Sequence, residues 1–505
     1  MTTTTAATRP LGRAALAGSA DLLTGPPPGR TGIVHLGLGN FHRAHQAVYT
    51  AVAQGAEPGD WGILGVANRS RTVVDALRAQ DHLYSVLQLS PEGSRVSVPG
   101  VHTGTLVAAE DPHAVVAAIA DPAVRVVTLT VTEHGYRIAP RTGRLDLDAD
   151  DVRHDVRGGA PRTTVGQVAR ALERRALSHA APLTVLSCDN VQANGATTRG
   201  LVLDFLAAAG AHPDVVDWVE RTVTFPNTMV DRIVPASAPR YAAEVRRLTG
   251  LDDRAPVPAE PFSMWVVEDR FAAGRPAWER AGAVFSDEVD AYELVKLRLL
   301  NGTHSLIAYL GALDGRATIP DSRAQDFVEQ AARAVIADEY LPSIELPSGF
   351  DPEAYVDELF ARWSNSALGH RTSQVGSDGS VKLPQRVPEP ATRLLDRGVV
   401  PQHLALTVAA WLCCVAPPDG FDPGPHARAM ADPAAPRLAA LAREAGTARD
   451  LVEAVFRHGG VFGADLAERP DLLARVAEYV DLITTHGPRE AAAEAARSRA
   501  AAREA

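Results

Sequence analysis

Short apolar runs typical of strands alternate with helix-like stretches through the first half of this 505-residue chain. The predicted strands span residues 32–36, 61–67, 125–132 and 183–187, and predicted helices between them include residues 44–53, 72–80 and 165–176. A strand followed by a helix, repeated along a chain, is typical of an α/β domain whose sheet is mostly parallel. The alternation therefore restricts the first half to this class of fold.

Two glycines, Gly37 and Gly39, directly follow the first predicted strand and precede the first predicted helix. Glycines at such a turn let the backbone approach a pyrophosphate, which the start of the following helix attracts. The third glycine of the pattern G-x-G-x-x-G would fall at His42, so the standard fingerprint is incomplete. The motif predicts a nucleotide-binding turn, although many G-x-G turns are only turns.

The end of the second predicted strand bears on the choice of nucleotide. Dinucleotide-binding domains specific for NAD usually carry an acidic residue there, which binds the ribose hydroxyl. This chain has Asn68 and Arg69 instead, so NAD and NADP both stay open. Arg69 and Arg71 either meet a 2′-phosphate or are solvated surface charges.

Helical patterns dominate from about Asp287 onwards. The predicted helices span residues 291–310, 322–338, 352–363, 402–414, 434–445 and 448–457. We therefore predict an α/β fold in which a Rossmann-type dinucleotide-binding domain precedes a mainly α-helical C-terminal domain. The expected segments are a flexible leader at 1–30, the nucleotide-binding domain at 31–286, a helical substrate and catalytic domain at 287–487, and an Ala-rich tail at 488–505.

The first helix of the C-terminal half carries the motif K-x-x-x-x-N-x-x-H, formed by Lys296, Asn301 and His304. At ~100° per residue of an α-helix, Asn301 lies about 140° and His304 about 80° from Lys296, so all three can border one cavity. A buried lysine has a lowered pKa and can act as a general base near neutral pH. An amide beside such a base suits a reaction in which an alcohol oxygen gains negative charge. The alternative is a lysine that extends to solvent beside two ordinary polar side chains.

Composition narrows the class of function. The chain has 50 basic and 61 acidic residues, a net charge of −11, which argues against nucleic-acid or anionic-membrane partners. Its three cysteines, Cys188, Cys413 and Cys414, form neither a disulfide framework nor a zinc-site pattern, so we expect a cytoplasmic location and no metal. No apolar run reaches the ~18 residues that span a bilayer, and the first residues lack a signal-peptide core. We therefore expect a small-molecule partner.

Six segments of the chain occur in the order found in one known family. They are GLGNFHRAHQ (37–46), TVTEHGY (130–136), SCDNVQANG (187–195), FPNTMVDRIVP (225–235), EPFSMWVVEDRF (260–271) and ELVKLRLLNGTHS (293–305). Together they resemble the mannitol dehydrogenase family of long-chain, metal-free, polyol-specific dehydrogenases, from about Gly32 to beyond Arg386. The resemblance implies a nicotinamide-dependent reaction in which a secondary alcohol becomes a ketone.

The resemblance also implies roles for individual residues. Lys296 matches the family's catalytic lysine, which is the base in oxidation and the acid in reduction, and Asn190 and Asn301 match two asparagines that hold the substrate oxygen. His304 matches a histidine that positions the substrate, and Glu293 a glutamate linked to proton passage. The implied substrate-binding residues are Asp231, Lys382 and Arg371. The implied cofactor-binding residues, for NAD with NADP not excluded, are Gly37, Gly39, Asn40, Phe41, Asn68 and Glu133.

Residues 370–386 bear on the substrate. Their pattern, HRT-x-Q followed by DGS-x-KLPQR, resembles fructuronate reductases, also called D-mannonate oxidoreductases. Mannitol 2-dehydrogenases similar to this chain carry Arg where Gln374 stands. A keto-sugar acid has a carboxylate with which Arg371, Lys382 or Arg386 can pair. The alternative for the two arginines is a structural role in ion pairs.

Other interpretations stay open at this point. A mannitol 2-dehydrogenase acting on mannitol and fructose, or a mannitol-1-phosphate 5-dehydrogenase, would share the same motifs. A nucleotide-binding sensor without catalysis is more remote, because the lysine, asparagine and histidine set is intact. A zinc-dependent polyol dehydrogenase would need a cluster of zinc ligands, and this sequence has no such cluster. Tyr292 completes the pattern Y-x-x-x-K of short-chain dehydrogenases, but those chains are about half this length, so we assign Tyr292 to packing.

Overall fold

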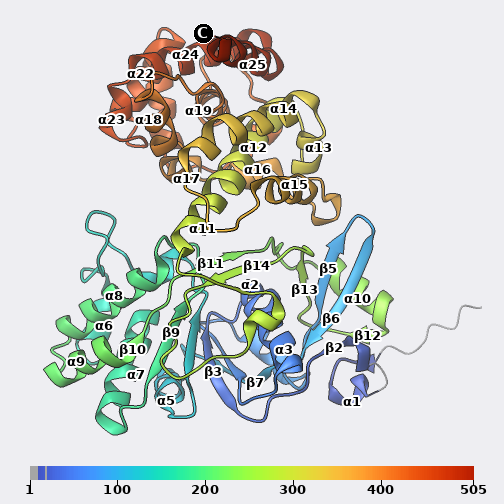
Figure 1. Ribbon diagram of the computed structural model, residues 1–505, viewed down its shortest axis with the longest axis vertical. Helices are drawn as coiled ribbons and strands as arrows, with labels where there is room; N and C mark the ends of the chain where they lie inside the picture. Colours follow the sequence, from blue (N-terminus) through green and yellow to red (C-terminus); the bar gives the residue numbers. More distant parts are fainter. Residues whose placement is uncertain (1–8, 18–19, 505) are drawn as a thin grey trace, which may run out of the picture. The chain divides into compact units, whose positions relative to one another are not determined.

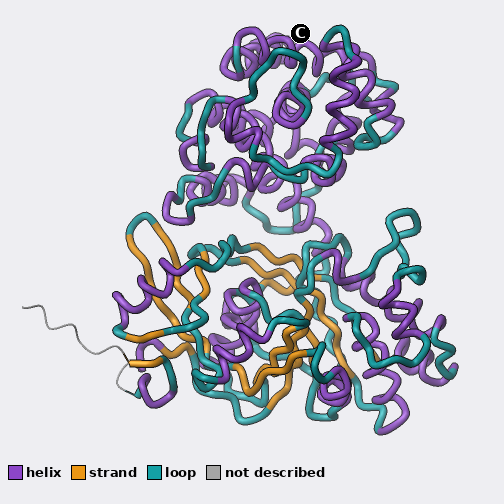
Figure 2. Tube along the Cα trace, turned by 180° about the vertical axis from the view of Figure 1, so that it is seen from behind, coloured by secondary structure: helices purple, strands orange, loops and turns teal. Residues whose placement is uncertain are grey.

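A computed structural model of the chain describes residues 9–17 and 20–504. It divides into two compact units, Met1–Asp290 and Ala291–Ala505 (Figure 1). Every strand among the described residues belongs to the first unit, and the second is built from helices (Figure 2). No helix within these residues is both long and apolar enough to cross a membrane.

A six-stranded, fully parallel sheet forms the centre of the first unit, in the order β7-β4-β3-β8-β9-β10. The strands are β3 (Thr31–Leu36), β4 (Gly62–Ala67), β7 (His102–Val107), β8 (Val126–Leu129), β9 (Leu183–Ser187) and β10 (Val223–Thr224). The chain runs outwards from β3 to β4 and β7, and then returns to the other side of β3 at β8. In open parallel sheets, ligands bind beyond the carboxyl ends of the strands at such a reversal.

Helices cover both faces of this sheet, because successive side chains of a strand point to opposite faces. In β3, Val34 and Leu36 pack on one face and Ile33 packs on the other. The helices on the first face are α5 (Pro112–Ala120), α7 (Thr164–Ser178), α8 (Asn194–Ala208) and α9 (Pro213–Thr222). Those on the second are α3 (Gln46–Ala56) and α4 (Arg71–Arg78). The sheet is therefore buried on both sides, and only its edges and strand ends are open to a ligand.

Smaller sheets and helices complete the first unit. One sheet has the order β13-β5-β6-β2, with β2 (Leu23–Thr24), β5 (Val86–Ser90), β6 (Gly93–Pro99) and β13 (Val257–Ala259). The others are β11 (Thr228–Asp231), β14 (Met264–Val267) and β15 (Val284–Phe285), and the pair β1 (Arg9–Pro10) and β12 (Leu251–Asp252). The remaining helices are α1 (Arg13–Leu16), η1 (Ala20–Leu22), α2 (Asn40–Ala44), η2 (Glu133–Tyr136), α6 (Asp150–Val156), α10 (Pro239–Thr249) and η3 (Trp278–Ala281).

The segment predicted as a flexible leader, residues 1–30, contains regular structure. Within it, β1 pairs with β12 and β2 pairs with β6. Residues 1–8 and 18–19 of the same segment lie outside the described residues. The part of the leader that is described is thus attached to the first unit by strand pairing.

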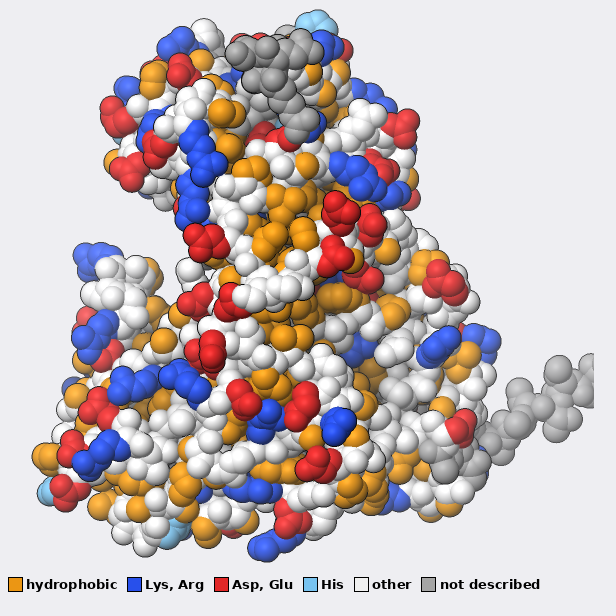
Figure 3. Space-filling view, viewed as in Figure 1, with side chains coloured by type: hydrophobic (Ala, Val, Ile, Leu, Met, Phe, Trp, Pro, Cys, Tyr) orange, Lys and Arg blue, Asp and Glu red, His pale blue; other side chains and the backbone are white. Residues whose placement is uncertain are grey.

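Ion pairs are frequent on the surface of the first unit. On the face shown in Figure 3, Lys and Arg side chains are interspersed with Asp and Glu. Arg275, for example, contacts both Asp269 at 2.8 Å and Glu279 at 2.6 Å. The charge of many surface arginines is therefore balanced by an adjacent carboxylate.

Two central helices, α12 (Thr303–Leu313) and α19 (Gln402–Val415), organise the second unit. Both are buried on nearly every side, as expected for helices that are apolar all round. The helices before and around α12 are α11 (Val289–Val295), η4 (Lys296–Gly302), α13 (Ile319–Arg323), α14 (Asp326–Ala334), η5 (Val335–Tyr340), η6 (Leu341–Ser343), α15 (Pro352–Trp363) and η7 (Ser366–Leu368). The rest are α16 (Thr372–Gly376), α17 (Gly379–Arg386), α18 (Pro388–Leu395), α20 (Gly424–Arg428), α21 (Ala435–Glu444), α22 (Ala448–His458), α23 (Ala464–Ala467), α24 (Pro470–His486) and α25 (Pro488–Glu504).

Of the Ala-rich tail predicted at 488–505, residues 488–504 form α25, which packs against α14, α19 and α24, and residue 505 lies outside the described residues. Ala491, Ala492 and Ala495 are buried in these contacts. Small side chains let the helix approach its neighbours closely, so the first half of α25 belongs to the helical core.

Candidate active site

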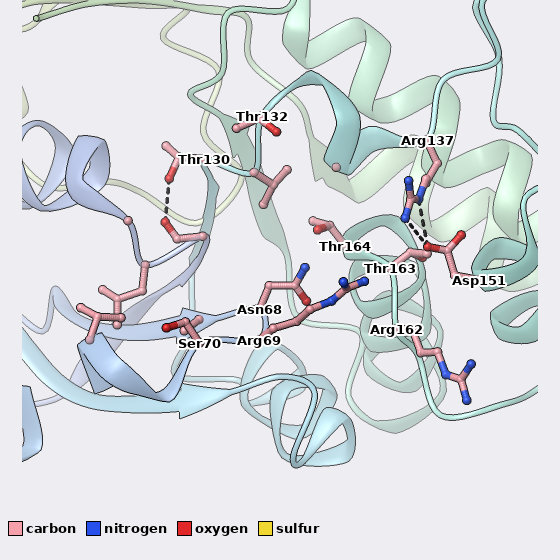
Figure 4. A pocket seen from close by; sticks show the side chains of 17 residues that line it. Asn68, Arg69, Ser70, Thr130, Thr132, Arg137, Asp151, Arg162, Thr163 and Thr164 are labelled. Atoms are coloured by element: carbon pink, nitrogen blue, oxygen red, sulfur yellow. Dashed lines mark hydrogen bonds and ion pairs between the residues drawn. The ribbon is translucent and has the colours of Figure 1, made fainter. Parts of the chain in front are cut away.

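A cavity of about 330 Å³ lies beyond the carboxyl ends of β3, β4 and β8 in the first unit (Figure 4). This is the place where the strand order reverses. Residues from the first turn, from the end of β4 and from the start of α7 line it, including Gly37, Gly39, Asn68, Arg69, Thr130 and Thr163. The sheet topology alone favours this place for a dinucleotide.

Gly37 is required by the backbone of the first turn. Its φ of +106° is a conformation that side-chain-bearing residues rarely adopt, and a Cβ atom there would lie 2.0 Å from the carbonyl oxygen of Thr130. The carbonyl of Gly37 accepts hydrogen bonds from Thr130 Oγ1 at 2.9 Å and from His35 Nε2 at 3.0 Å. Gly39 differs, since the nearest atom to a Cβ there would be the Gly37 oxygen at 3.7 Å. The turn is thus fixed at Gly37 and open towards the cavity at Gly39.

The six residues proposed to bind the cofactor fall into two groups. Gly37, Gly39 and Asn68 line the cavity. Asn40 accepts a hydrogen bond from Arg43 and donates one to Ser237, Phe41 stacks on His45, and Glu133 is exposed in η2. These last three lie next to the lining rather than in it.

Several lining residues carry no sequence signal of their own. Thr163 and Thr164 begin α7, and Arg137 follows η2 and pairs with Asp151 at 2.9 Å. These residues follow β8 in the chain, and they reach the cavity because β8 lies beside β3 in the sheet. A sequence pattern predicts strands but does not show which strands are neighbours. The carboxylate of Asp189, after β9, holds the loop after β8 by accepting from the backbone N–H groups of residues 131 and 132, both at 2.9 Å.

In the second unit, the motif helix is not a regular α-helix. Lys296 begins the π-helical segment η4, which joins α11 to α12. Hydrogen bonds in a π-helix span five residues, and Asn301 is five residues after Lys296. The angle between these two residues around the helix axis is therefore smaller than the 140° expected from α-helical geometry. The α-helical angles predicted for this motif are therefore wrong. Such segments occur frequently at functional sites, and both side chains are half-buried.

A second π-helical segment and one arginine support η4. A Cβ atom on Gly302 would lie 2.3 Å from the hydroxyl oxygen of Tyr340, the last residue of η5, so the two segments are in close contact. Arg386 Nη1 donates to the carbonyl oxygen of Asn301 at 2.9 Å and to Ser305 Oγ at 2.6 Å. Arg386 therefore fixes the backbone that carries the predicted amide donor.

His304 lies in a cluster of positively charged groups. Its ring is buried, 5.0 Å from the ring of His370 and 6.1 Å from that of Trp363. Burial, and then the neighbouring His370, Arg386, Arg362 and Lys382, lower its pKa well below the usual range, so the imidazole is neutral. Its Nε2 atom is buried without a hydrogen-bond partner within the described residues.

Lys382 and Arg386 retain unused N–H donors near this histidine. Lys382 Nζ donates to the carbonyl oxygens of Val375 at 3.2 Å and Ser377 at 2.6 Å, which leaves one of its three N–H groups. Burial, and then the charge of Arg386, lower the pKa of Lys382. The Nε atom of Arg386 is buried, and within the described residues it has no partner.

The other predicted residues of the second unit lie as follows. Glu293 is half-buried in α11. Arg371 is exposed immediately before α16 and forms an isolated backbone bridge with Thr318. The structure thus groups Lys382 and Arg386 with His304 and adds His370 and Arg362, to which the sequence motifs assign no role. The signal for His370 was present, since it begins the HRT-x-Q pattern.

Two asparagines after β9 have different surroundings. Asn190 is exposed, whereas Asn194 is buried and donates from Nδ2 to Asp189 O at 3.1 Å and Thr228 O at 2.9 Å. Asn194 Oδ1 also accepts from the N–H of Thr228 at 2.9 Å. Asn194 is therefore committed to joining β9 to β11, and Asp231 lies buried at the end of β11.

Comparison with known proteins identifies the family. A model of the mannitol dehydrogenase Rossmann domain matches residues 31–280, and a model of the mannitol dehydrogenase C-terminal domain matches residues 288–484. The chain belongs to the mannitol dehydrogenase family. It is an oxidoreductase, and the predicted order of a Rossmann-type domain followed by a helical domain is confirmed.

Other members of the mannitol dehydrogenase family match nearly the whole chain. The D-mannonate oxidoreductase of Escherichia coli (strain K12) is 38% identical, over 91% of this chain and 95% of that protein. The mannitol 2-dehydrogenase of Cereibacter sphaeroides is 36% identical, over 90% and 94%. A solved structure of Pseudomonas fluorescens mannitol 2-dehydrogenase, a ternary complex with NAD and D-mannitol, shares 32% identity and a TM-score of 0.82, and covers 96% of this chain and 99% of that one. Overall identity therefore does not choose between a sugar acid and a polyol.

Within residues 9–17 and 20–504, no three His, Cys, Asp or Glu side chains are grouped so that they could hold a metal ion. The three cysteines are buried and free.

Proposed function

We propose that the chain is a metal-independent, NAD(P)-dependent oxidoreductase that interconverts an aldonate and the matching keto-uronate, as a fructuronate reductase (D-mannonate oxidoreductase). The observation that carries this proposal is the cationic cluster around His304. Lys382 and Arg386 both keep N–H donors that no described residue uses. A substrate carboxylate would receive charge-assisted hydrogen bonds from them, about twice as strong as neutral ones.

The cavity of the first unit fits a dinucleotide such as NAD. Gly37 supplies the required turn, and Gly39 leaves the space that a pyrophosphate needs. The similar Pseudomonas fluorescens structure holds NAD, which supports the same cofactor here. When bound, the nicotinamide supplies the acceptor or donor of a hydride.

The chain's own residues handle the proton and the substrate oxygen. In oxidation, Lys296 Nζ takes the proton of the substrate hydroxyl, and in reduction it returns the proton to the same oxygen. The amides of Asn301 and Asn190 donate N–H groups to that oxygen while it carries negative charge. His304, kept neutral by its surroundings, can donate or accept a hydrogen bond through Nε2 and so orient the sugar chain.

The experiment that tests this proposal is a steady-state comparison of fructuronate, tagaturonate, fructose, fructose 6-phosphate and xylulose with NADH and NADPH. Fructuronate should give a higher kcat/KM than fructose. Lys382→Gln should lower kcat/KM for fructuronate more than for fructose, because it removes a cation that only the acid engages as an ion pair. Arg371→Gln is the comparison variant, because Arg371 is the other predicted substrate-binding cation; Arg371 is exposed, so we expect it to change the ratio less than Lys382→Gln does.

A higher kcat/KM for fructose than for fructuronate in the unmodified enzyme would contradict the sugar-acid assignment. A mannitol 2-dehydrogenase activity would then describe the chain better. Preference for fructose 6-phosphate would point to a phosphorylated polyol instead. A change of ratio in Arg371→Gln with none in Lys382→Gln would show that the wrong cation was chosen.

A further inference from the structure

The end of β4 presents no carboxylate to the nucleotide cavity. Asn68, Arg69 and Ser70 follow β4 and line the cavity one after another. In dinucleotide-binding sheets, this position faces the adenosine ribose, where a carboxylate accepts from the 2′-hydroxyl and repels a 2′-phosphate. The one acidic residue in the cavity wall that the structure describes is Asp151, and its charge is engaged by Arg137 at 2.9 Å. The ribose end of the cavity is therefore free of unbalanced negative charge.

Arg69 brings a positive charge to this place. Its side chain is exposed and, among the described residues, it forms no ion pair and no hydrogen bond. Figure 4 shows its guanidinium extending into the cavity, on the side of Thr163 and Thr164. Several other surface arginines of the unit, Arg275 among them, instead have their charge balanced by a neighbouring carboxylate. No residue that the structure describes competes with a ligand for the five N–H donors of Arg69.

Arg71 provides the contrast. It lies two residues further along the chain, outside the cavity lining, and contacts Asp75 at 3.7 Å and Glu110 at 3.3 Å. Its charge is thus balanced on the surface. The two arginines that the sequence left equivalent have different environments, and only Arg69 is placed to meet the nucleotide.

The hydroxyl of Ser70 is a second available group. Ser70 is the residue directly before α4, but its side chain makes no capping hydrogen bond to that helix. Serine at this position usually accepts from a backbone N–H of the first turn. Here the hydroxyl is left to donate to a ligand oxygen beside Arg69.

We infer that the cavity binds NADP(H) as well as NAD(H), with the 2′-phosphate held by the Arg69 guanidinium and the Ser70 hydroxyl. The inference rests on the proposed use of a nicotinamide dinucleotide by this cavity, and it names the residue that decides between the two forms. A phosphate dianion paired with a guanidinium gains charge-assisted hydrogen bonds that NAD cannot make.

The test is a binding measurement on the full chain, without substrate. Kd values for NADPH and NADH would be measured by fluorescence titration, with competition by 2′,5′-ADP and 5′-ADP as probes of the adenosine end. In the unmodified chain, NADPH should bind at least as tightly as NADH, and 2′,5′-ADP should compete better than 5′-ADP. Arg69→Gln should weaken NADPH about 10- to 100-fold and leave NADH within about threefold, the scale of losing hydrogen bonds to a charged group. Arg71→Gln is the matched control and should change neither Kd.

The outcomes separate this inference from the function on which it rests. If NADH binds and NADPH binds more than tenfold more weakly in the unmodified chain, the 2′-phosphate site is refuted while the cavity assignment stands. If Arg69→Gln weakens the binding of NADH and NADPH equally, the 2′-phosphate site is also refuted, because Arg69 would then contact a part of the coenzyme that both forms share. If neither coenzyme binds, the proposed function itself fails.

Discussion

Replacing Gly37 by Ala tests the nucleotide-binding turn most directly. At φ +106° an L-residue is strained, which costs about 1–2 kcal/mol for left-handed backbone. The added methyl carbon would also lie 2.0 Å from the Thr130 oxygen and 2.6 Å from its carbonyl carbon. Thr130 directly follows β8, and these are its backbone atoms. The steric clash can be removed only if the turn or the end of the strand moves, which costs a further ~1–3 kcal/mol. We therefore expect Gly37→Ala to lower the free energy of unfolding by roughly 2–5 kcal/mol.

Gly39→Ala is the control for this substitution. Its φ of −102° suits any residue, and its nearest neighbour would be 3.7 Å away, so the free energy of unfolding should change by less than ~0.5 kcal/mol. The methyl group would nevertheless occupy the space left for the dinucleotide. Gly39→Ala should thus fold normally and bind NADH more weakly, whereas Gly37→Ala should lose both stability and binding.

Urea unfolding and NADH titration of the two variants measure these effects. Wild-type stability in Gly37→Ala would show that the turn accommodates a Cβ atom and that the steric argument is wrong. Unchanged NADH binding in Gly39→Ala would show that the dinucleotide does not pass over this turn.

Four further outcomes are expected. Lys296→Ala should lower kcat by about 10²- to 10⁴-fold with NADH binding intact, as measured by steady-state kinetics and titration, and near wild-type turnover would remove Lys296 from the acid–base role. Asn190→Ala should lower kcat by roughly 10²- to 10³-fold, whereas Asn194→Ala should mainly destabilise the fold because it breaks buried hydrogen bonds; the reverse pattern would show that the wrong asparagine was chosen. Burial lowers the pKa of His35 and of His102 from 6.5 to about 3, so both are neutral when folded, and their stabilisation is complete above pH 6.5 and decreases as the pH falls towards 3. Each histidine should lower the free energy of unfolding by about 1.4 kcal/mol per pH unit between pH 6.5 and 3. Urea unfolding at pH 7.5, 6 and 5 measures this loss, and an unchanged free energy of unfolding would contradict the prediction. Chelation by EDTA should leave the rate unchanged, and activity that falls and returns with added zinc would overturn metal independence.

Local sequence patterns predicted elements well where a single periodicity ran through the segment. The strand expected at 183–187 is β9, and the helix expected at 352–363 is α15, with the same bounds. Elements that are short or polar were missed, such as β10 and the pair β5 and β6. The helix expected at 322–338 is interrupted, because α13 ends at Arg323 and α14 begins at Asp326. A two-residue strand has too few side chains to show a period, and its existence depends on its neighbour in the sheet.

The sequence by itself determined the family, the order of the two domains, the glycine turn and the identity of the motif residues Lys296, Asn301 and His304. Each of these depends on which residues stand close together along the chain. Tertiary structure decided what those residues meet. It made the Lys296 segment a π-helix, set Arg386 against the Asn301 carbonyl 85 positions away, and left Arg69 in the cavity while Arg71 paired with Glu110. Contacts between distant positions follow from how helices and strands pack, and spacing along the chain carries no record of that packing.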